Sequence, residues 1–300
     1  MKRNIILHLF QYKLLDIIPY LDKIKEQGFT HIQISPIQKV KQDDGPWWML
    51  YQSCGFEIGN KQIGTKEDFK LLCIEAHKRG LQIICDVILN HVAGDNYGNL
   101  IPYESVDKLL TSNKYFFKEP KIINNWNNRY EVINYCCKGL PTLRLDNYDL
   151  QDLIINFLNE LIDYGADGFR IDSAKQIALP EEGSDFFIRV FNNLKNKDNL
   201  FNYAEVIFEE KSLIDKYCKY INVLTNSFGS DKSKMVTFFE SHDSFLEFGY
   251  TKNMSNQMMI NEWETLFKTG NWSTIFYARP FDDLWQSKEI KDINLKYNLI

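Results

Sequence analysis

Acidic side chains recur in this sequence directly after short apolar runs. Four such stretches are Asp86–His91, Gly168–Asp172, Tyr203–Glu205 and Glu240–Asp243. Carboxylates gathered around one cleft suit the cleavage of an acetal. One acid protonates the leaving oxygen, and a carboxylate stabilises or traps the oxocarbenium-like carbon. We therefore expect glycosidic-bond chemistry if the fold brings these four stretches together.

Two of the acids have surroundings that suit different tasks. Arg170 and Asp172 lie two residues apart on a predicted strand, so both side chains face the same way. A fixed guanidinium beside Asp172 keeps that carboxylate ionised, as a nucleophile must be. Glu205 would need a less polar setting to hold a proton near neutral pH. A single Asp at a strand end is more often a turn or capping residue, and Asp86 fits a structural role before Asn90.

Apolar runs that alternate with helical patterns must position these residues. The predicted strands are Ile5–Phe10, His31–Ser35, Leu81–Leu89, Gly168–Asp172, Phe201–Val206, Ile221–Leu224, Met235–Glu240 and Thr274–Ala278. The predicted helices are Leu14–Glu26, Thr65–Arg79, Leu150–Tyr164, Asp185–Lys195, Ser212–Tyr220, Asn261–Lys268 and Lys288–Tyr297. Strands that alternate with helices indicate an α/β fold with a parallel sheet. Eight strands favour a closed (β/α)₈ TIM barrel, whose active site lies at the C-terminal ends of the strands.

The pattern divides the chain into three parts. Residues 1–91 and 146–300 form the two parts of the barrel, and residues 92–145, rich in Asn, Tyr and Lys, form a short insertion after the third strand. Only 38 positions separate Glu205 from Asp243, although one βαβ unit takes roughly 30 residues or more. We therefore predict that the sixth helix is missing. Part of the barrel wall would then be uncovered, and either mobile or capped by a partner chain.

Composition excludes several classes of protein. Apolar residues make up 44% and charged residues 25% of the chain, which is typical of a folded domain rather than a disordered one. The net charge of −5 and the interleaved basic residues argue against a nucleic-acid partner. No apolar run approaches the ~20 residues of a membrane span. The six cysteines show no CxxC pair, so we expect no zinc site.

The start of the chain carries no apolar stretch that ends in a small-residue cleavage site. Together with the isolated cysteines, this predicts a cytoplasmic protein. A leader lying outside this sequence would instead make the protein secreted. The sequence leaves the oligomeric state open.

Four stretches in this order resemble the signature motifs of the α-amylase superfamily, glycoside hydrolase family thirteen. They are DVILNH at 86–91, GFRIDSAKQ at 168–176, the residues around Glu205, and ESHD at 240–243. Flanking stretches such as QISPI at 33–37 and FYARP at 276–280 are similar too. The resemblance covers nearly the whole chain and is strongest to the bacterial starch-degrading α-amylases.

The resemblance implies a role for each matching residue. Asp172 would be the nucleophile, Glu205 the general acid/base, and Asp243 the third acid, which binds sugar hydroxyls. The residues implied in substrate contact are Tyr51, Gln52, His91, Arg170, Lys175, His242, Trp47 and Trp48. The implied reaction is hydrolysis of internal α-1,4-glucosidic bonds in starch, glycogen or maltooligosaccharides. The configuration at the anomeric carbon would be retained.

Three departures from the family pattern bear on function. Gln176 and Thr142 stand where the family has calcium ligands, which leaves Asn90 as the clear remaining candidate. Calcium prefers several oxygens that include carboxylates, so we expect no tight calcium site and no required cofactor. We expect a short sixth barrel unit and no C-terminal β-sandwich of the kind that the family carries. A glucan transglycosylase of the same superfamily and a degenerate, non-catalytic glucan-binding protein therefore stay open as alternatives.

Overall fold

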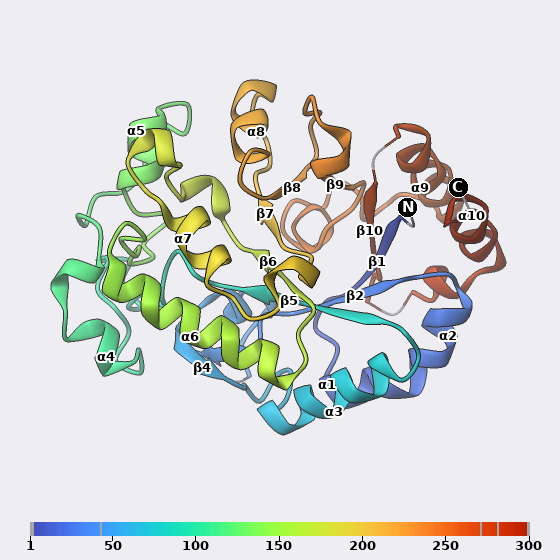
Figure 1. Ribbon diagram of the computed structural model, residues 1–300, viewed down its shortest axis with the longest axis horizontal. Coiled ribbons are helices and arrows are strands. Elements are labelled where there is room, and N and C mark those ends of the chain that lie inside the picture. Colours follow the sequence, from blue (N-terminus) through green and yellow to red (C-terminus); the bar gives the residue numbers. More distant parts are fainter. Residues whose placement is uncertain (1–2, 43, 271, 281, 299–300) are drawn as a thin grey trace.

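The computed structural model describes residues 3–42, 44–270, 272–280 and 282–298, and its centre is a closed barrel of eight strands (Figure 1). Neighbouring strands are parallel around the whole barrel, in the order β1-β10-β9-β8-β7-β6-β5-β2. The barrel strands are β1 (Asn4–Leu9), β2 (His31–Ile34), β5 (Gln82–Val87), β6 (Gly168–Ile171), β7 (Tyr203–Glu205), β8 (Asn222–Thr225), β9 (Met235–Phe238) and β10 (Ser273–Tyr277). The predicted TIM barrel is confirmed.

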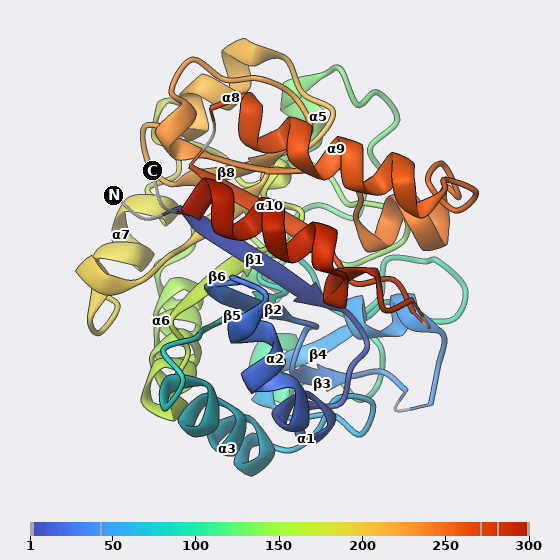
Figure 2. The ribbon, with the colours of Figure 1, turned by 90° about the vertical axis from the view of Figure 1, so that its right-hand side faces the viewer.

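Helices surround this barrel, as the alternating pattern predicts. They are α1 (Leu14–Ile17), α2 (Leu21–Glu26), α3 (Lys66–His77), α6 (Tyr148–Tyr164), α7 (Phe186–Asn192), α8 (Lys211–Tyr217), α9 (Asn256–Lys268) and α10 (Lys288–Asn298). Thr65 caps α3 through a reciprocal pair of hydrogen bonds with Asp68, of 3.1 and 2.9 Å. Figure 2 shows α9 and α10 lying side by side across the outer face near β1.

Two layers of apolar side chains hold the barrel together. The smaller, inner cluster fills the barrel and consists of Ile6, Ile84, Tyr203, Leu224, Val236 and Ile275. The larger cluster lies between the strands and the helices. Gly168 is required at the start of β6, because a Cβ atom there would lie 2.0 Å from the carbonyl oxygen of Phe201. A packed interior of this kind leaves polar chemistry to the strand ends.

The link between β8 and β9 lacks a helix, as predicted. Residues 226–234, all described, contain only the 3₁₀ turn Lys232–Lys234. The expectation that this leaves the barrel wall uncovered is wrong, because Val223 and Met235 are buried. Helix α8 of the preceding unit packs against this wall and shares its apolar cluster through Ile214 and Tyr217.

The predicted insertion carries two short helices, α4 (Lys108–Thr111) and α5 (Arg129–Asn134), which Figure 1 places on the side away from α9 and α10. A hairpin of β3 (Gln38–Val40) and β4 (Ser53–Ile58), which the sequence pattern does not predict, precedes it. The six cysteines, all of them among the described residues, form no disulfide. Among the described residues, no helix combines the length and apolar character needed to cross a bilayer.

Candidate active site

One buried guanidinium organises the acids at the strand ends. Arg170 Nη1 donates to Asp86 Oδ1 at 2.8 Å and to Asp172 Oδ1 at 2.7 Å, and Arg170 Nη2 binds Glu205 Oε1. These side chains come from β5, the end of β6 and β7, which are neighbours in the barrel. Because the guanidinium is a rigid planar fork, Asp172 and Glu205 face one compartment.

The second oxygen of Glu205 is held by the backbone that follows Asp172. Ser173 N donates to Glu205 Oε2 at 3.0 Å. Ser173 has a φ of 49°, a left-handed conformation that is costly for a residue other than glycine. Burial raises the pKa of Glu205 to about 7, although the charge of Arg170 opposes this rise. A carboxyl with that pKa can hold a proton near neutral pH and release it.

Asp243 lies on the same rim but has no arginine bound to it. It is the first residue of the π-helical turn Asp243–Glu247, and such turns are frequent at functional sites. Burial raises the pKa of Asp243 to about 6. His242 Nε2 lies 3.6 Å from Asp243 Oδ2, and burial lowers the pKa of His242 to about 3. His242 is therefore neutral at neutral pH and acts as a dipolar, aromatic neighbour of Asp243.

An aromatic group borders the acids. The rings of Tyr51 and His242 are stacked with centroids 5.3 Å apart and an interplanar angle of 7°, and Phe10 stacks on His242 at 4.5 Å. Trp47 packs edge-on against His242 at 5.6 Å, whereas Trp48 is 46% exposed. Of the two tryptophans, Trp48 is thus the one that presents a free apolar surface.

The remaining predicted contact residues have partners within the protein. His91 Nε2 lies 3.0 Å from the carbonyl oxygen of Tyr51. Gln52 Oε1 accepts a weak hydrogen bond from Gly94 N at 3.3 Å. The ammonium of Lys175 lies 3.3 Å from Glu209 and 5.1 Å from the ring centre of Trp126.

Two features of the rim were missed or misplaced by the sequence analysis. Asp86 does not brace the loop before Asn90. Its carboxylate binds Arg170 and accepts a 2.9 Å hydrogen bond from the hydroxyl of Tyr51. Glu240, inside the ESHD stretch, forms a buried two-pronged ion pair with Arg279 at 2.8 and 3.0 Å. The sequence does carry a signal for the Glu240–Arg279 pair. Each of these charged residues directly follows a mostly apolar run.

Comparisons with known proteins identify the family of this chain. The family model for the α-amylase catalytic domain matches residues 13–279.

This chain belongs to the α-amylase family.

An α-amylase from Clostridium acetobutylicum is 30% identical over 341 aligned positions, which cover 99% of this chain and 44% of that protein. The chain thus spans less than half the length of this curated relative.

Solved α-amylase structures have the same fold. A Geobacillus thermoleovorans α-amylase complexed with acarbose has a TM-score of 0.78 at 20% identity, with 99% of this chain and 79% of that chain covered. A variant α-amylase from Eisenia fetida in complex with maltohexaose has a TM-score of 0.78 at 18% identity, with 99% and 77% covered. At these identities the likeness establishes the barrel fold of this amylase-family chain.

Proposed function

We propose that this protein is a retaining glycoside hydrolase that cleaves internal α-1,4-glucosidic bonds of starch, glycogen or maltooligosaccharides. The observation that carries the proposal is the joint attachment of Asp172 and Glu205 to the two terminal nitrogens of Arg170. Membership of the α-amylase family supports a glycoside hydrolase. The acarbose and maltohexaose complexes of the related folds support an α-glucan as the substrate class.

In this proposal the two acids have complementary roles. Asp172 accepts a hydrogen bond from Arg170 at 2.7 Å, which holds its carboxylate in place for attack on the anomeric carbon. Glu205, whose pKa burial raises to about 7, donates its proton to the leaving glycosidic oxygen. A covalent glycosyl-enzyme on Asp172 results. Glu205, now ionised, then takes a proton from the water that releases the sugar with its configuration retained.

The other rim residues would bind and orient the sugar. Asp243 is 29% exposed at its side chain, so its oxygens can reach sugar hydroxyls. Tyr51 offers a ring that can stack on the sugar, and Trp48 offers a second apolar surface. Apolar sugar faces pack on aromatic rings, whereas their hydroxyls need polar partners.

The test is release of reducing ends from soluble starch by the wild-type protein and by Asp172→Asn. We expect activity in the wild type and a loss of about 10⁴-fold in the variant, comparable to the loss on removing one catalytic residue of a hydrolase. Equal activity in both proteins contradicts the role of Asp172. Chromatography at high maltooligosaccharide concentration separates hydrolysis from transfer, because longer products form only by transglycosylation. Acarbose binding without turnover would indicate the non-catalytic alternative.

A further inference from the structure

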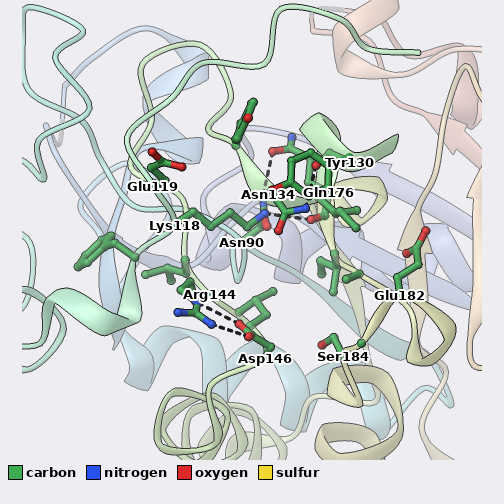
Figure 3. A pocket seen from close by; sticks show the side chains of 18 residues that line it. Asn90, Lys118, Glu119, Tyr130, Asn134, Arg144, Asp146, Gln176, Glu182 and Ser184 are labelled. Carbon is green, nitrogen blue, oxygen red and sulfur yellow. Dashed lines mark hydrogen bonds and ion pairs between the residues drawn. The ribbon is translucent and has the colours of Figure 1, made fainter. Parts of the chain in front are cut away.

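A polar pocket of about 300 Å³ lies between the insertion and the barrel, beside the turn that follows Asp172 (Figure 3). That turn is the 3₁₀ helix Ala174–Gln176. The lining includes Asn90 and Gln176, two positions where the family resemblance predicts calcium ligands. Asn90 Nδ2 donates to Gln176 Oε1 at 3.1 Å, and Asn90 Oδ1 is buried without a hydrogen-bond partner. The family site can therefore be tested against the donors that are present.

The donor set does not fit calcium. Calcium takes six to eight oxygens and favours carboxylates, but each acid lining this pocket is paired with a base. These pairs are Glu119–Lys121 at 2.8 Å, Asp146–Arg144 at 2.7 Å and Glu182–Arg129 at 2.7 Å. Thr142 supplies only a hydroxyl, which donates to the carbonyl oxygen of Leu140. The described part of the chain contains no group of three or more acidic, His or Cys side chains suited to a metal.

Basic side chains of the insertion bind the turn instead. Lys118 Nζ donates to the carbonyl oxygen of Gln176 at 3.2 Å, and Figure 3 shows Lys118 extending toward Asn90 and Gln176. Arg129 binds the carbonyl oxygen of Lys175 and donates to that of Ile177 at 3.2 Å. Three successive carbonyl oxygens therefore each accept a hydrogen bond from a positively charged group.

We propose that Lys118 and Arg129 replace a bridging calcium ion in this chain, fastening the insertion to the turn that follows the nucleophile. An ammonium and a guanidinium bring positive charge to carbonyl oxygens without a metal. Burial lowers the pKa of Lys118 only to about 8, so its ammonium stays mostly protonated at neutral pH. A calcium ion in the same place would be repelled by both side chains.

The hydrogen bonds from Lys118 and Arg129 to this turn, here called the bridge, affect the acids through one residue. Ser173 lies between Asp172 and the bound turn, and its N–H holds Glu205 Oε2 at 3.0 Å. A shift of the turn would move this N–H and relax the left-handed backbone of Ser173, whose φ is 49°. Lys118 is thus a positioning residue. That role rests on the proposed function, whereas independence from calcium does not.

Thermal unfolding of the wild-type protein in EDTA and in excess calcium chloride tests the calcium part without any activity measurement. We expect the same Tm in both solutions. A ligand that binds only the folded state raises the Tm, so a higher Tm in calcium, or a lower one in EDTA, overturns the proposal. This outcome does not depend on whether the protein hydrolyses starch.

Lys118→Met tests the bridge, with Lys118→Arg as the variant that keeps a cation. Lys108→Met, an exposed lysine of the same insertion in α4, is the matched control. We expect Lys118→Met to lower the Tm by about 2–6 °C, as for a lost charged hydrogen bond. Well below its Tm we expect a fall in kcat on starch with little change in KM. Lys118→Arg should recover part of the lost Tm and part of the lost kcat.

If Lys118→Met behaves like Lys108→Met in Tm and kcat, the bridge is refuted. A lower Tm with an unchanged kcat refutes the positioning role and leaves only a structural contact. If Lys118→Met does not fold, two measurements still test the proposal. They are the Tm and kcat of Lys118→Arg, and the Tm of the wild-type protein in calcium and in EDTA. A wild-type protein inactive on starch, yet indifferent to calcium and destabilised by Lys118→Met, would refute the proposed function alone.

Discussion

Two arginines are buried near the C-terminal ends of the barrel strands, and their surroundings differ. Arg279 forms a close ion pair with one buried carboxylate, that of Glu240, and donates to the carbonyl oxygen of Thr251 at 2.9 Å. The partly exposed carboxylate of Asp282 lies 4.0 Å from Arg279. Arg170 faces three carboxylates, including those of Asp172 and Glu205. The buried charges of the first group balance one to one, because Asp282 is partly exposed and more distant, whereas the second group has an excess of negative charge.

We interpret this difference as one between a structural group and the proposed catalytic group. A buried, balanced pair costs desolvation and rigidifies the place where it lies. An unbalanced group keeps carboxyl pKa values high, because each negative charge disfavours the ionisation of its neighbours. The pKa of Glu205 is raised to about 7 mainly by burial, with the charges of Asp172 and Asp243 adding to the rise. Perturbed groups of this kind are typical of catalytic sites.

The largest effect is expected for Glu205→Gln, which removes the acid from the unbalanced group. We predict that kcat on starch falls by about 10²–10⁴-fold, the usual contribution of a general acid or base. Substrates with a good leaving group, such as α-maltosyl fluoride, should lose much less in the glycosylation step, because they need no protonation. Pre-steady-state rates on the two substrates measure this. A similar loss of the glycosylation rate on both would show that Glu205 acts in another way.

In the balanced group, Arg279→Met should affect stability rather than chemistry. Leaving Glu240 buried without its partner should lower the free energy of unfolding by about 3–5 kcal/mol, measured by urea denaturation. Starch hydrolysis by the folded fraction, well below the Tm, should stay near the wild-type rate. Arg189→Met removes a more exposed pair with Asp152 and should cost under about 1 kcal/mol. A large loss of activity in folded Arg279→Met would erase the distinction between the two arginines.

The pH profile tests the electrostatic part of the comparison. Glu205 must be protonated to act as an acid, so the wild-type kcat/KM should fall as the pH rises through about 7, tenfold per unit. Asp243→Asn removes a negative charge that helps to raise this pKa. Its residual activity should therefore begin to fall at a lower pH. If the alkaline fall of kcat/KM stays at the same pH or moves to a higher pH in Asp243→Asn, then Asp243 does not act on the pKa of Glu205.

The smallest effect is expected at the edge of the site. Glu209→Gln releases Lys175 from a partly exposed ion pair of 3.3 Å. Pairs of this kind contribute little, so kcat/KM on maltooligosaccharides should change by less than about fivefold, or about 1 kcal/mol. Steady-state kinetics of both proteins measure this change in kcat/KM. A change as large as that in Glu205→Gln would place Lys175 inside the catalytic group.

The position of the strand-end residues could be predicted because it is encoded locally. Arg170 and Asp172 share a face by the two-residue period of a strand, and the parallel barrel then brings in Glu205 from its neighbour. The short link between β8 and β9 followed from counting residues. These inferences need only periodicity, spacing and the rule that parallel strands end at one rim.

The contacts made by loops could not be predicted, because no period places them. Asp86 was expected to act in the loop before Asn90, but its partner Arg170 lies 84 positions away. The hydrogen bonds that Lys118 and Arg129 donate to the turn after Asp172 depend on how the insertion folds back onto the barrel. The buried wall at β8 and β9 also arises from tertiary packing, because α8 contacts β8 and its Ile214 shares an apolar cluster with Val223 and Met235.

The central claim is that Asp172 attacks the sugar that Glu205 protonates. Mass spectrometry of Glu205→Gln after incubation with α-maltotriosyl fluoride tests it directly, because this substrate forms the glycosyl-enzyme without an acid and the variant releases it slowly. We predict a maltotriosyl adduct that peptide mapping assigns to Asp172. An adduct on Asp86 or Asp243, or turnover with inverted configuration and no adduct, would contradict the account.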